Sequence, residues 1–477
     1  MKYSKIKNEI INTVFNKLKK NKNILSASFV GSFVDNGNLK KINDIDLIII
    51  LKKLNQKSFN SIKGQINNLN LRKFFPKKKI FINDTFGPLK FNSSKLLVIH
   101  LMIYDLNGHI EHTIKSPFTV YDWERSKNYF NQSLSSLFTT GNIQLVDFIN
   151  SRRGTLNYLR DIKNKKISYR VYKFSEKKFK IVRKNINLKE RDKFEFYFHV
   201  VKNLLLNFFK FKSNKNKLFS LKTNDKKIKQ YIGNNFYNKH YQGINKIIEK
   251  KRNLDFCTEK KLDKWIISFI KDFQKKILNL QKNSKKITFI RHAKTSMNDS
   301  SFLGQKRNPS IEIINYKIKK EKYSKIYTSP MNRCIETVKI ISKQKKYLKN
   351  NNLLEIDYGK LEGLDIIQLK KKYPDLISKW LNGKDPKFPK GENQNDVVKR
   401  IKIFIDTVKR NKSMNTCVIS HNVFLRCLIG IYFKIRMKDW YKINIPHLMK
   451  LEFIIIGNNI YPNIERKKLK IIFSNLY

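Results

Sequence analysis

The fold of the C-terminal part of the chain is decided by the stretch Ile287-Thr288-Phe289-Ile290-Arg291-His292-Ala293-Lys294-Thr295. A run of apolar and β-branched residues ends abruptly in an arginine, a histidine and a small residue. This pattern predicts a buried strand that delivers two polar side chains to its carboxyl edge, where open α/β sheets place their ligand sites. One such pair is weak evidence, so the interpretation depends on the segments downstream of it.

Three later segments carry polar groups of the same kind. Residues 326–337 predict a strand, a turn and the start of a helix, which places Arg333 near a helix N-terminus where an anion is favoured. Glu355 lies in an acidic loop, and residues 416–426 form a second strand-to-helix junction with His421 at the strand end. Arginine forks bind phosphoryl oxygens, an imidazole can attack phosphorus, and a carboxylic acid can protonate the leaving oxygen. Together these groups indicate a phosphate-handling site.

These motifs resemble those of the histidine phosphatase superfamily, which has the phosphoglycerate mutase-like fold. Residues 291–295 correspond to the opening Arg-His-Gly-x-Thr motif of that family. The other blocks are Ser-x-x-x-Arg-x-x-x-Thr at 329–337, Glu-x-x-x-Gly-x-x-Glu-Gly at 355–363, Pro-x-Gly-Glu-Ser at 389–393 and Val-Ser-His-Gly at 419–422. Five blocks in the family's order, over about residues 286 to 455, are far more specific than any single motif.

The resemblance implies a role for each matching residue. His292 would be the phosphohistidine nucleophile and Glu355 the general acid and base. Arg291, Arg333 and His421 would bind the transferring phosphoryl group. No metal or other cofactor is implied for this chemistry, and the substrate would be a small-molecule phosphomonoester.

The chain departs from the family pattern at two glycines. Ala293 and Asn422 stand where the family has glycine, and neither change removes a chemical group. Asparagine tolerates the left-handed conformation, so we expect a positive φ at Asn422. Asn298 and the pair Gly304-Gln305 fall where family members line the pocket. The short spacing between blocks favours a compact phosphatase over a mutase.

A separate constellation lies in the N-terminal third. Gly31-Ser32 follows a predicted strand over residues 24–30, and Asp44 and Asp46 open a second strand. Alternation places both carboxylates on one face of that strand, which suits Mg²⁺. A Gly-Ser turn offers backbone N–H groups and a hydroxyl to phosphates.

Residues 1–120 therefore resemble the polymerase-β-like nucleotidyltransferase superfamily, whose signature is Gly-Ser followed by Asp-x-Asp. The resemblance implies that Gly31 and Ser32 bind a nucleoside triphosphate and that Asp44 and Asp46 bind Mg²⁺.

The third carboxylate of that superfamily has no clear counterpart in this chain. The expected later strand, residues 96–105, carries His100 at its centre, and the candidates for the missing acid are Asp105 at the strand end and Asp84. Two hypotheses result. The N-terminal domain either transfers a nucleotidyl group, or it is a non-catalytic nucleotide or RNA binder that regulates the phosphatase.

The chain is thus expected to be an α/β multidomain protein. A small nucleotidyltransferase-type mixed sheet with helices would occupy residues 1–121, a helical segment 122–285, and a three-layer α/β/α sandwich, the histidine phosphatase domain, 286–477. Within the helical segment, the pair Arg152-Arg153 could bind phosphate, but a solvated basic face is the favoured interpretation.

The strongly basic composition is weak evidence for a nucleic-acid partner. The net charge is +64, which would suit nucleic acid, but lysines are spread along the chain together with Asn and Ile. We therefore favour coding bias, and nucleic acid stays a possible but unfavoured partner. Cys257, Cys334, Cys417 and Cys427 form no close pair, which indicates reduced thiols. The lack of a signal-like N-terminus or a membrane-length apolar run predicts a cytoplasmic protein without a membrane partner.

The leading hypothesis is a bifunctional cytoplasmic enzyme that acts on small phosphorylated metabolites. Its C-terminal domain would hydrolyse a phosphomonoester, and its N-terminal domain would use Mg²⁺ and a nucleoside triphosphate.

Overall fold

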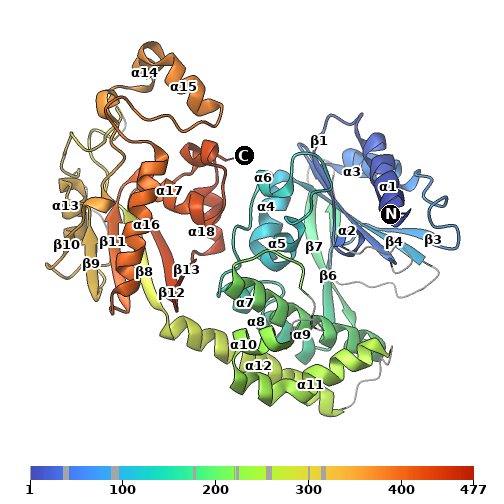
Figure 1. The fold of residues 1–477 in the computed structure, drawn as a ribbon. Coiled ribbons are helices and arrows are strands. Elements are labelled where there is room, and N and C mark those ends of the chain that lie inside the picture. Colours follow the sequence, from blue (N-terminus) through green and yellow to red (C-terminus); the bar gives the residue numbers. More distant parts are fainter. Residues whose placement is uncertain are drawn as a thin grey trace. The chain divides into compact units, whose positions relative to one another are not determined.

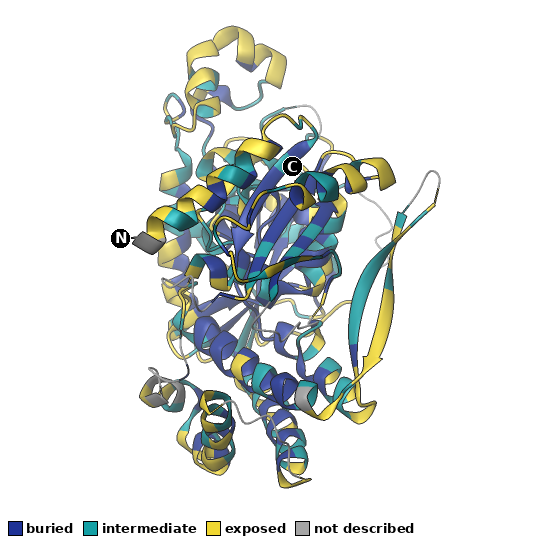
Figure 2. Ribbon diagram, turned by 90° about the vertical axis from the view of Figure 1, so that its right-hand side faces the viewer, coloured by how far each residue is buried: buried dark blue, intermediate teal, exposed yellow. Residues whose placement is uncertain are grey.

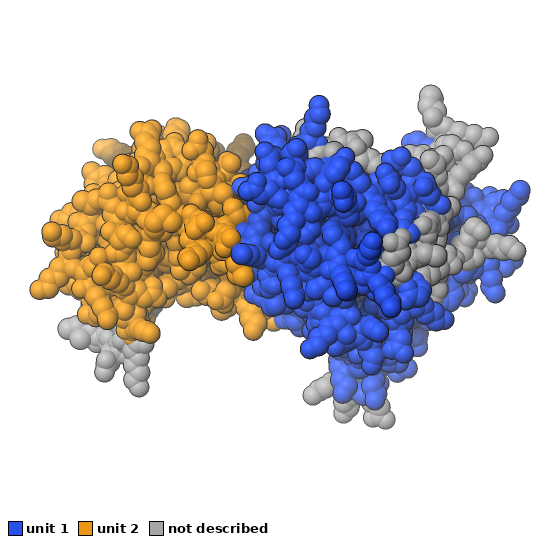
Figure 3. Space-filling model, turned by 90° about the horizontal axis from the view of Figure 1, so that it is seen from below, with its two compact units in different colours: residues 1–277 blue, residues 278–477 orange. Residues whose placement is uncertain are grey.

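The chain forms two compact units in a computed structural model, Met1–Ile277 and Leu278–Tyr477 (Figure 3). The structure describes residues 2–35, 42–87, 96–175, 179–219, 221, 225–253, 260–298, 301–312 and 318–476. Cys257 lies outside these ranges. Helix α12 (Lys260–Asn283) runs across the boundary between the units, and the strand that comes after it begins at Lys285.

The first unit is built on a mixed five-stranded sheet of order β3-β4-β2-β1-β5 (Figure 1). Strand β4 is parallel to both β3 and β2, whereas β1 is antiparallel to β2 and β5. A separate antiparallel ribbon pairs β6 with β7. The strands are β1 (Ile24–Val30), β2 (Asp44–Leu51), β3 (Lys79–Asn83), β4 (Leu96–Asp105), β5 (Tyr129–Asn131), β6 (Lys166–Phe174) and β7 (Phe179–Asn187).

Helices cover the sheet and fill the rest of this unit. Those before residue 164 are α1 (Lys2–Leu18), α2 (Ser32–Asp35), α3 (Gln56–Asn67), α4 (Leu106–Lys115), α5 (Pro117–Trp123), α6 (Leu134–Leu137), α7 (Asp147–Asn150) and α8 (Thr155–Lys163). Those after the ribbon are α9 (Glu190–Ser213), α10 (Asp225–Ile232), α11 (Asn234–Arg252) and α12.

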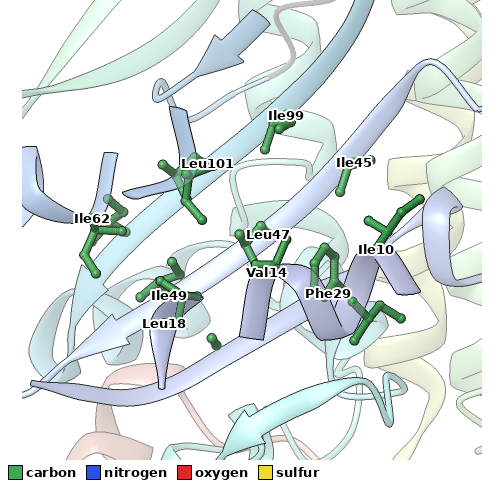
Figure 4. Packing of buried hydrophobic residues seen from close by; sticks show 14 of the residues in the cluster. Ile10, Val14, Leu18, Phe29, Ile45, Leu47, Ile49, Ile62, Ile99 and Leu101 are labelled. Atoms are coloured by element: carbon green, nitrogen blue, oxygen red, sulfur yellow. The ribbon is translucent and has the colours of Figure 1, made fainter. Parts of the chain in front are cut away.

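Strand alternation divides the core of the first unit into two layers. Odd-numbered residues of β2, such as Leu47, pack with α1 and α3, and Figure 4 shows Val14 and Leu18 of α1 meeting this face. Even-numbered residues, such as Ile48, pack instead with Val120 and Trp123 of α5. Because both faces are covered, β2 is a nearly continuous apolar run after its two aspartates.

The segment expected to be helical, residues 122–285, contains three strands, which corrects that prediction. Strand β5 pairs with β1 and so extends the first sheet beyond residue 121. Strands β6 and β7 form the long ribbon, which Figure 2 shows as mostly intermediate and exposed. Its alternating aromatic and β-branched residues are typical of strands, but the abundant lysines between them hide the pattern.

The second unit contains a six-stranded sheet of order β10-β9-β11-β8-β12-β13. The first four strands in this order are parallel, and β12 and β13 are antiparallel additions at one edge. The strands are β8 (Lys285–Arg291), β9 (Lys325–Thr328), β10 (Leu348–Lys349), β11 (Asn415–Ser420), β12 (Lys450–Ile456) and β13 (Asn459–Pro462). The helices are α13 (Asn332–Ile341), α14 (Ile366–Lys372), α15 (Pro374–Leu381), α16 (Gln394–Arg410), α17 (Asn422–Tyr432) and α18 (Arg466–Ile472), with short 3₁₀ turns at Asn351–Leu353, Gly359–Leu361 and Met437–Lys442.

Helices lie on both faces of the second sheet. Ile290 of β8 packs in one cluster with Val338 of α13. The neighbouring Phe289 points to the other face, where its ring lies 6.4 Å from that of Phe404 in α16. A strand that is apolar on both sides requires a helix layer on each, so the second unit is a three-layer α/β/α sandwich.

Two glycines of the second unit give a matched test of backbone packing. Gly359 has φ +56°, and a Cβ there would lie 2.1 Å from the carbonyl oxygen of Pro389. Gly457 has a similar φ of +59° but no atom within 4 Å of its would-be Cβ. We expect Gly359→Ala to destabilise by about 3 kcal/mol, from overpacking and conformational strain together. We expect Gly457→Ala to cost only about 1 kcal/mol, from conformation alone.

Thermal unfolding of the full-length variants measures the difference. For a unit of this size, about 1 kcal/mol lowers Tm by roughly 2–4 °C. Equal decreases in Tm for the two variants would show that the close approach at Gly359 is not tight.

Candidate active site

Three parallel strands of the second unit end at the same edge of the sheet. Arg291, the last residue of β8, pairs with Ser420, the last of β11. Thr328, the last of β9, pairs with Ile419. The residues directly after the three strands are His292, Ser329 and His421. The structure therefore brings both predicted histidines to one place at the carboxyl edge.

His292 is buried and is held as a neutral imidazole. Burial, followed by the charge of Arg333, lowers the pKa of His292 well below the ordinary value. Its Nδ1 lies 2.7 Å from the carbonyl oxygen of Ala293, which can only accept, so Nδ1 carries the proton. In the neutral ring Nε2 then has a lone pair, as a nucleophile attacking phosphorus requires.

Arg333 is fully buried at the start of α13, where backbone oxygens hold its guanidinium. Nη2 donates to the carbonyl of Gly304 at 2.8 Å and Nη1 to that of Arg307 at 3.1 Å. Nε donates to Nδ1 of His421 at 3.2 Å. Neutral acceptors orient this cation without neutralising it, so its charge remains available to an anion.

The ring of His421 contacts both Arg333 and Ser329. Burial and the charge of Arg333 lower the pKa of His421 well below its usual value. Because Nδ1 accepts from Arg333, the neutral ring carries its proton on Nε2, 2.8 Å from the hydroxyl oxygen of Ser329. The centroids of the His421 and His292 rings are 5.2 Å apart.

Glu355 is buried against the N-terminus of α17. Its Oε1 accepts from the backbone N–H groups of Ile356, Val423 and Phe424 at 3.0, 3.0 and 3.3 Å. Its Oε2 accepts from Val423 at 3.2 Å. The helix that begins after His421 thus positions the carboxyl group beside the histidines.

Arg291 and Asn422 complete the predicted set, with one correction. Arg291 donates from Nη1 to the carbonyl of Ile445 at 2.7 Å. Asn422 is the first residue of α17 and is absent from the residues with positive φ, so the expected left-handed conformation is wrong. The chain enters the helix directly from an extended His421, and no left-handed turn is needed.

In the first unit, the antiparallel register of β1 and β2 brings the four predicted residues together. Val30, the last residue of β1, pairs with Asp46, so the Gly31-Ser32 turn lies beside the start of β2. Gly31 has φ +71°, and a Cβ there would lie 2.4 Å from Oδ2 of Asp46. The Ser32 hydroxyl donates to Oδ1 of Asp44 at 2.9 Å.

Neither candidate for a third carboxylate joins this group. The residue next to Asp46 on β4 is His100, whose Nδ1 lies 2.9 Å from Nδ2 of Asn83. Asp105 caps α4 at the opposite end of β4, about 16 Å along the strand from His100. Asp84 pairs with Lys63 at 2.7 Å. Within the described ranges no three His, Cys, Asp or Glu side chains are grouped so that they could hold a metal ion.

The C-terminal geometry agrees with a family match. The model of the histidine phosphatase superfamily (branch 1) matches residues 287–459. The C-terminal region belongs to this superfamily.

Individual relatives match the chain only in part. Phosphoserine phosphatase 1 of Hydrogenobacter thermophilus is 26% identical over 155 residues, which are 30% of this chain and 74% of that protein. The 6-phosphofructo-2-kinase/fructose-2,6-bisphosphatase 1 of Mus musculus is 27% identical over 207 residues, 40% of this chain but 42% of that protein. Among solved structures, the α-ribazole phosphatase of Shigella flexneri is 16% identical, with a TM-score of 0.33 over 38% of this chain and 95% of its own. The family match says nothing about the first unit, where the nucleotidyltransferase resemblance stays a prediction.

Sequence reasoning missed the support of the phosphatase site. Arg400 of α16 forms a two-pronged ion pair with Glu392, through Nε to Oε1 at 2.9 Å and Nη2 to Oε2 at 2.8 Å. The same guanidinium donates to the carbonyls of Asn352, Leu354 and Glu355. It therefore fixes the loop that carries Glu355. No motif marks Arg400, which lies beside the buried face of α16, three residues after Val397 and four before Phe404.

His447 was also missed. Its Nδ1 lies 2.9 Å from the carbonyl oxygen of His292, and the two ring centroids are 5.3 Å apart. Of the predicted pocket residues, Gln305 donates to the Glu355 carbonyl at 2.8 Å, and Asn298 uses its Oδ1 to accept from Thr295 at 2.9 Å. These contacts position the backbone at His292, Thr295 and Glu355.

Two further observations bear on the earlier expectations. None of the described helices is long and apolar enough to span a bilayer. Cys334, Cys417 and Cys427 are buried free thiols, and burial raises the pKa of each.

The neutral state of His292 predicts how stability depends on pH. In the unfolded chain this histidine has a pKa of about 6.5, and the folded pKa lies below that value. As pH falls through 6.5 the unfolded state binds the proton first, so the stabilisation present above pH 6.5 is progressively lost. We expect Tm to fall between pH 7 and pH 5, and to fall less in His292→Gln, whose side chain does not titrate.

At pH 8 His292 is neutral in both the folded and the unfolded state. The difference in Tm between wild type and His292→Gln at this pH therefore gives the effect of the substitution on packing, apart from protonation. Parallel Tm curves for wild type and variant would show that His292 is protonated in the folded state.

Proposed function

We propose that the second unit hydrolyses small phosphomonoesters through a phosphohistidine at His292. The observation that carries this proposal is the neutral imidazole with Nδ1 bonded to the Ala293 carbonyl, beside the charge of Arg333, whose hydrogen bonds go to neutral acceptors. The family match of residues 287–459 supports it independently.

The first step would transfer the phosphoryl group to the enzyme. Nε2 of His292 attacks phosphorus as the bond to the leaving oxygen breaks, and Glu355 gives that oxygen a proton. Of the two carboxyl oxygens, Oε2 accepts one backbone N–H at 3.2 Å while Oε1 accepts three, so Oε2 is the better place for the proton. The guanidinium groups of Arg333 and Arg291 stabilise the charge on the equatorial oxygens.

The second step would release the phosphate. Glu355, now ionised, takes a proton from a water molecule, whose oxygen attacks the phosphorus of phospho-His292. The N–P bond breaks, inorganic phosphate leaves, and the neutral imidazole and the protonated carboxyl group are restored.

The substrate would be a small phosphorylated metabolite. Two relatives are named for phosphoserine and for fructose 2,6-bisphosphate, both small phosphate esters. Which ester this chain acts on is a matter for substrate profiling, and the arginine-rich edge requires only a phosphoryl group.

Two substitutions test the roles separately. His292→Ala should lower release of phosphate from an aryl phosphate by about three orders of magnitude or more, because no nucleophile remains. Glu355→Gln should reduce kcat by roughly 10²–10⁴-fold for an alkyl phosphate, whose leaving group needs a proton, but much less for an aryl phosphate, whose leaving group is good.

His199→Ala, a histidine of the first unit, is the control and should keep wild-type turnover. Acid-labile-phosphate trapping with a ³²P-labelled substrate should label wild type and not His292→Ala. Unchanged turnover in His292→Ala, or equal effects of Glu355→Gln on both leaving groups, contradicts the mechanism.

We also propose that the first unit binds a nucleoside triphosphate with Mg²⁺ and transfers its nucleotidyl group. The convergence of the Gly31-Ser32 turn with Asp44 and Asp46 supports this proposal. The donor set fits Mg²⁺, which needs only one or two carboxylates and fills its other positions with water and phosphate oxygens. When bound, the ion would neutralise phosphate charge and align the phosphates.

The remaining residues would orient the nucleotide. The positive φ of Gly31 and its lack of a Cβ let the Asp46 carboxylate lie directly against the turn, so metal and phosphate would be held at one place. Lys78, whose Nζ donates to the Ile42 carbonyl and the Asn43 side chain at 2.6 Å, supplies a positive charge near Asp44.

Labelled nucleoside triphosphates with Mg²⁺ distinguish transfer from mere binding. Wild type should incorporate the α-phosphate label into an acceptor, and Asp44→Asn should lose most of this incorporation because one of the two carboxylates is gone. Asp84→Asn, which removes the partner of Lys63, is the matched control and should retain transfer. Binding without any transfer would favour the alternative, in which a non-catalytic nucleotide or RNA binder regulates the phosphatase.

A further inference from the structure

The pair Arg152-Arg153, which the sequence suggests is a solvated basic face, is not one in the structure. Arg152 comes after α7 and is partly buried. Its backbone N–H donates to the carbonyl of Lys115 at 2.9 Å, which ties it to the C-terminal end of α4. Its Nη1 donates to the Ser116 hydroxyl at 3.2 Å and lies 3.5 Å from Nδ1 of His112.

A second arginine reaches the same group of side chains from the β6–β7 ribbon. Arg170 exchanges two backbone hydrogen bonds with Phe86, at 2.8 and 2.7 Å. The Phe86 ring packs 4.9 Å from that of Tyr104, and the Tyr104 hydroxyl lies 3.3 Å from Nδ1 of His112. Arg183 lies directly opposite Arg170 on β7.

These cations outnumber the acids that act on them. Among the described residues, Arg152, Arg153 and Arg170 form no ion pair. Glu111, whose charge acts on Arg152, also pairs with Lys115 at 2.9 Å, and Asp161 is shared by Arg160 and Arg183. Like charges opposite one another on a ribbon destabilise it, and partly buried cations without partners are costly.

The pKa values of these groups reflect the excess of positive charge. Burial, and next the charge of Arg170, lower the pKa of Arg152 to about 10. Burial also lowers the pKa of Arg170. His112 is stacked on Trp123 at 5.1 Å, and burial together with both arginines lowers its pKa well below the ordinary value.

His112 supplies a separate indication that an acceptor is missing. Because Nδ1 accepts from Arg152, the neutral ring carries its proton on Nε2. Nε2 is buried, and the described part of the chain gives it no hydrogen-bond partner. Buried donors of native proteins are nearly always paired, so such an atom calls for an acceptor from outside.

We propose that Arg152, Arg170 and Ser116 form an anion-binding site of the first unit, which takes a phosphate or polyphosphate group. Two guanidinium groups with a hydroxyl match an anion that presents several oxygens, which favours phosphate over a single carboxylate. The site is distinct from the aspartates of β2. Tyr104, beside it, lies four residues further along β4 than His100, about 13 Å away.

The test uses the full chain with the phosphatase site disabled by His292→Ala and Arg333→Ala, because phosphate is also expected to bind there. Isothermal titration in EDTA with inorganic phosphate, tripolyphosphate and adenosine triphosphate should show binding of at least one of the three. Binding of inorganic phosphate alone would identify a site for the free ion. Binding of tripolyphosphate or adenosine triphosphate would identify a site for a polyphosphate or for the phosphate tail of a nucleotide. Adding Arg152→Gln or Arg170→Gln should weaken that binding by about tenfold or more.

Arg160→Gln is the matched control, since this arginine is 44% exposed and pairs with Asp161. It should leave the titration unchanged, as should Asp44→Asn, which separates this site from the proposed nucleotide site. Without ligand, Arg152→Gln and Arg170→Gln should not lower Tm, because each removes a repulsive charge. A lower Tm in the absence of ligand would instead indicate structural arginines.

Absence of binding to all three anions, or equal binding in the Arg152→Gln and Arg160→Gln proteins, overturns the proposal. Binding that needs Mg²⁺ and Asp44 also overturns it. So does binding of single-stranded RNA alone, with steep salt dependence and no response to the small anions, because it would indicate a nucleic-acid surface. If Arg152→Gln fails to fold, Arg170→Lys takes its place in the test. Lysine keeps the positive charge but lacks the paired donors of a guanidinium group, so this variant should bind the anion less tightly than the parent protein with His292→Ala and Arg333→Ala.

Discussion

The parallel pairing of β8 with β11 is the constraint on which the catalytic unit depends. Once Arg291 is paired with Ser420, the residues directly after each strand must meet at one edge, and His292 and His421 become neighbours. A shift of one residue would exchange the side chains that β8 presents to its two helix layers, so that Ile290 would face α16 and Phe289 would face α13. Burial of the strand therefore fixes the register, and the register places the histidines. The catalytic geometry is a consequence of core packing.

Burial also determines the charge state of the site. The same desolvation that stabilises the strands keeps His292 neutral, while Arg333, whose ordinary pKa is far higher, stays charged. Carbonyl oxygens of Gly304 and Arg307 orient the guanidinium without cancelling its charge. The first unit repeats this pattern in a different setting, where the charges of Arg152 and Arg170 repel each other and neither arginine forms an ion pair among the described residues. In both units a cation whose hydrogen-bond partners are neutral favours the binding of an anion.

Much of the candidate site in the second unit was predictable because its residues lie in short motifs. Arg291, His292, Arg333 and His421 each lie at a strand end or a helix start, where local pattern and chemistry agree, and Glu355 lies in an acidic loop. Arg400 and His447 were not predictable in this way, because they act on backbone atoms from distant elements. In the first unit the Gly31-Ser32 turn and the two aspartates were identified, but the β6–β7 ribbon was not, since lysine-rich strands resemble exposed helices.

The sequence by itself determined strands β8, β9 and β11 of the second unit, the chemical groups that follow them and the carboxylate pair of β2, because these depend on local alternation and on residue type. Only the tertiary structure decided which tautomer His292 adopts, which oxygens hold Arg333, and that Arg152 faces Ser116 and His112 instead of solvent. Those outcomes depend on burial and on hydrogen-bond partners that are far apart in the chain, and no local pattern of residues records them.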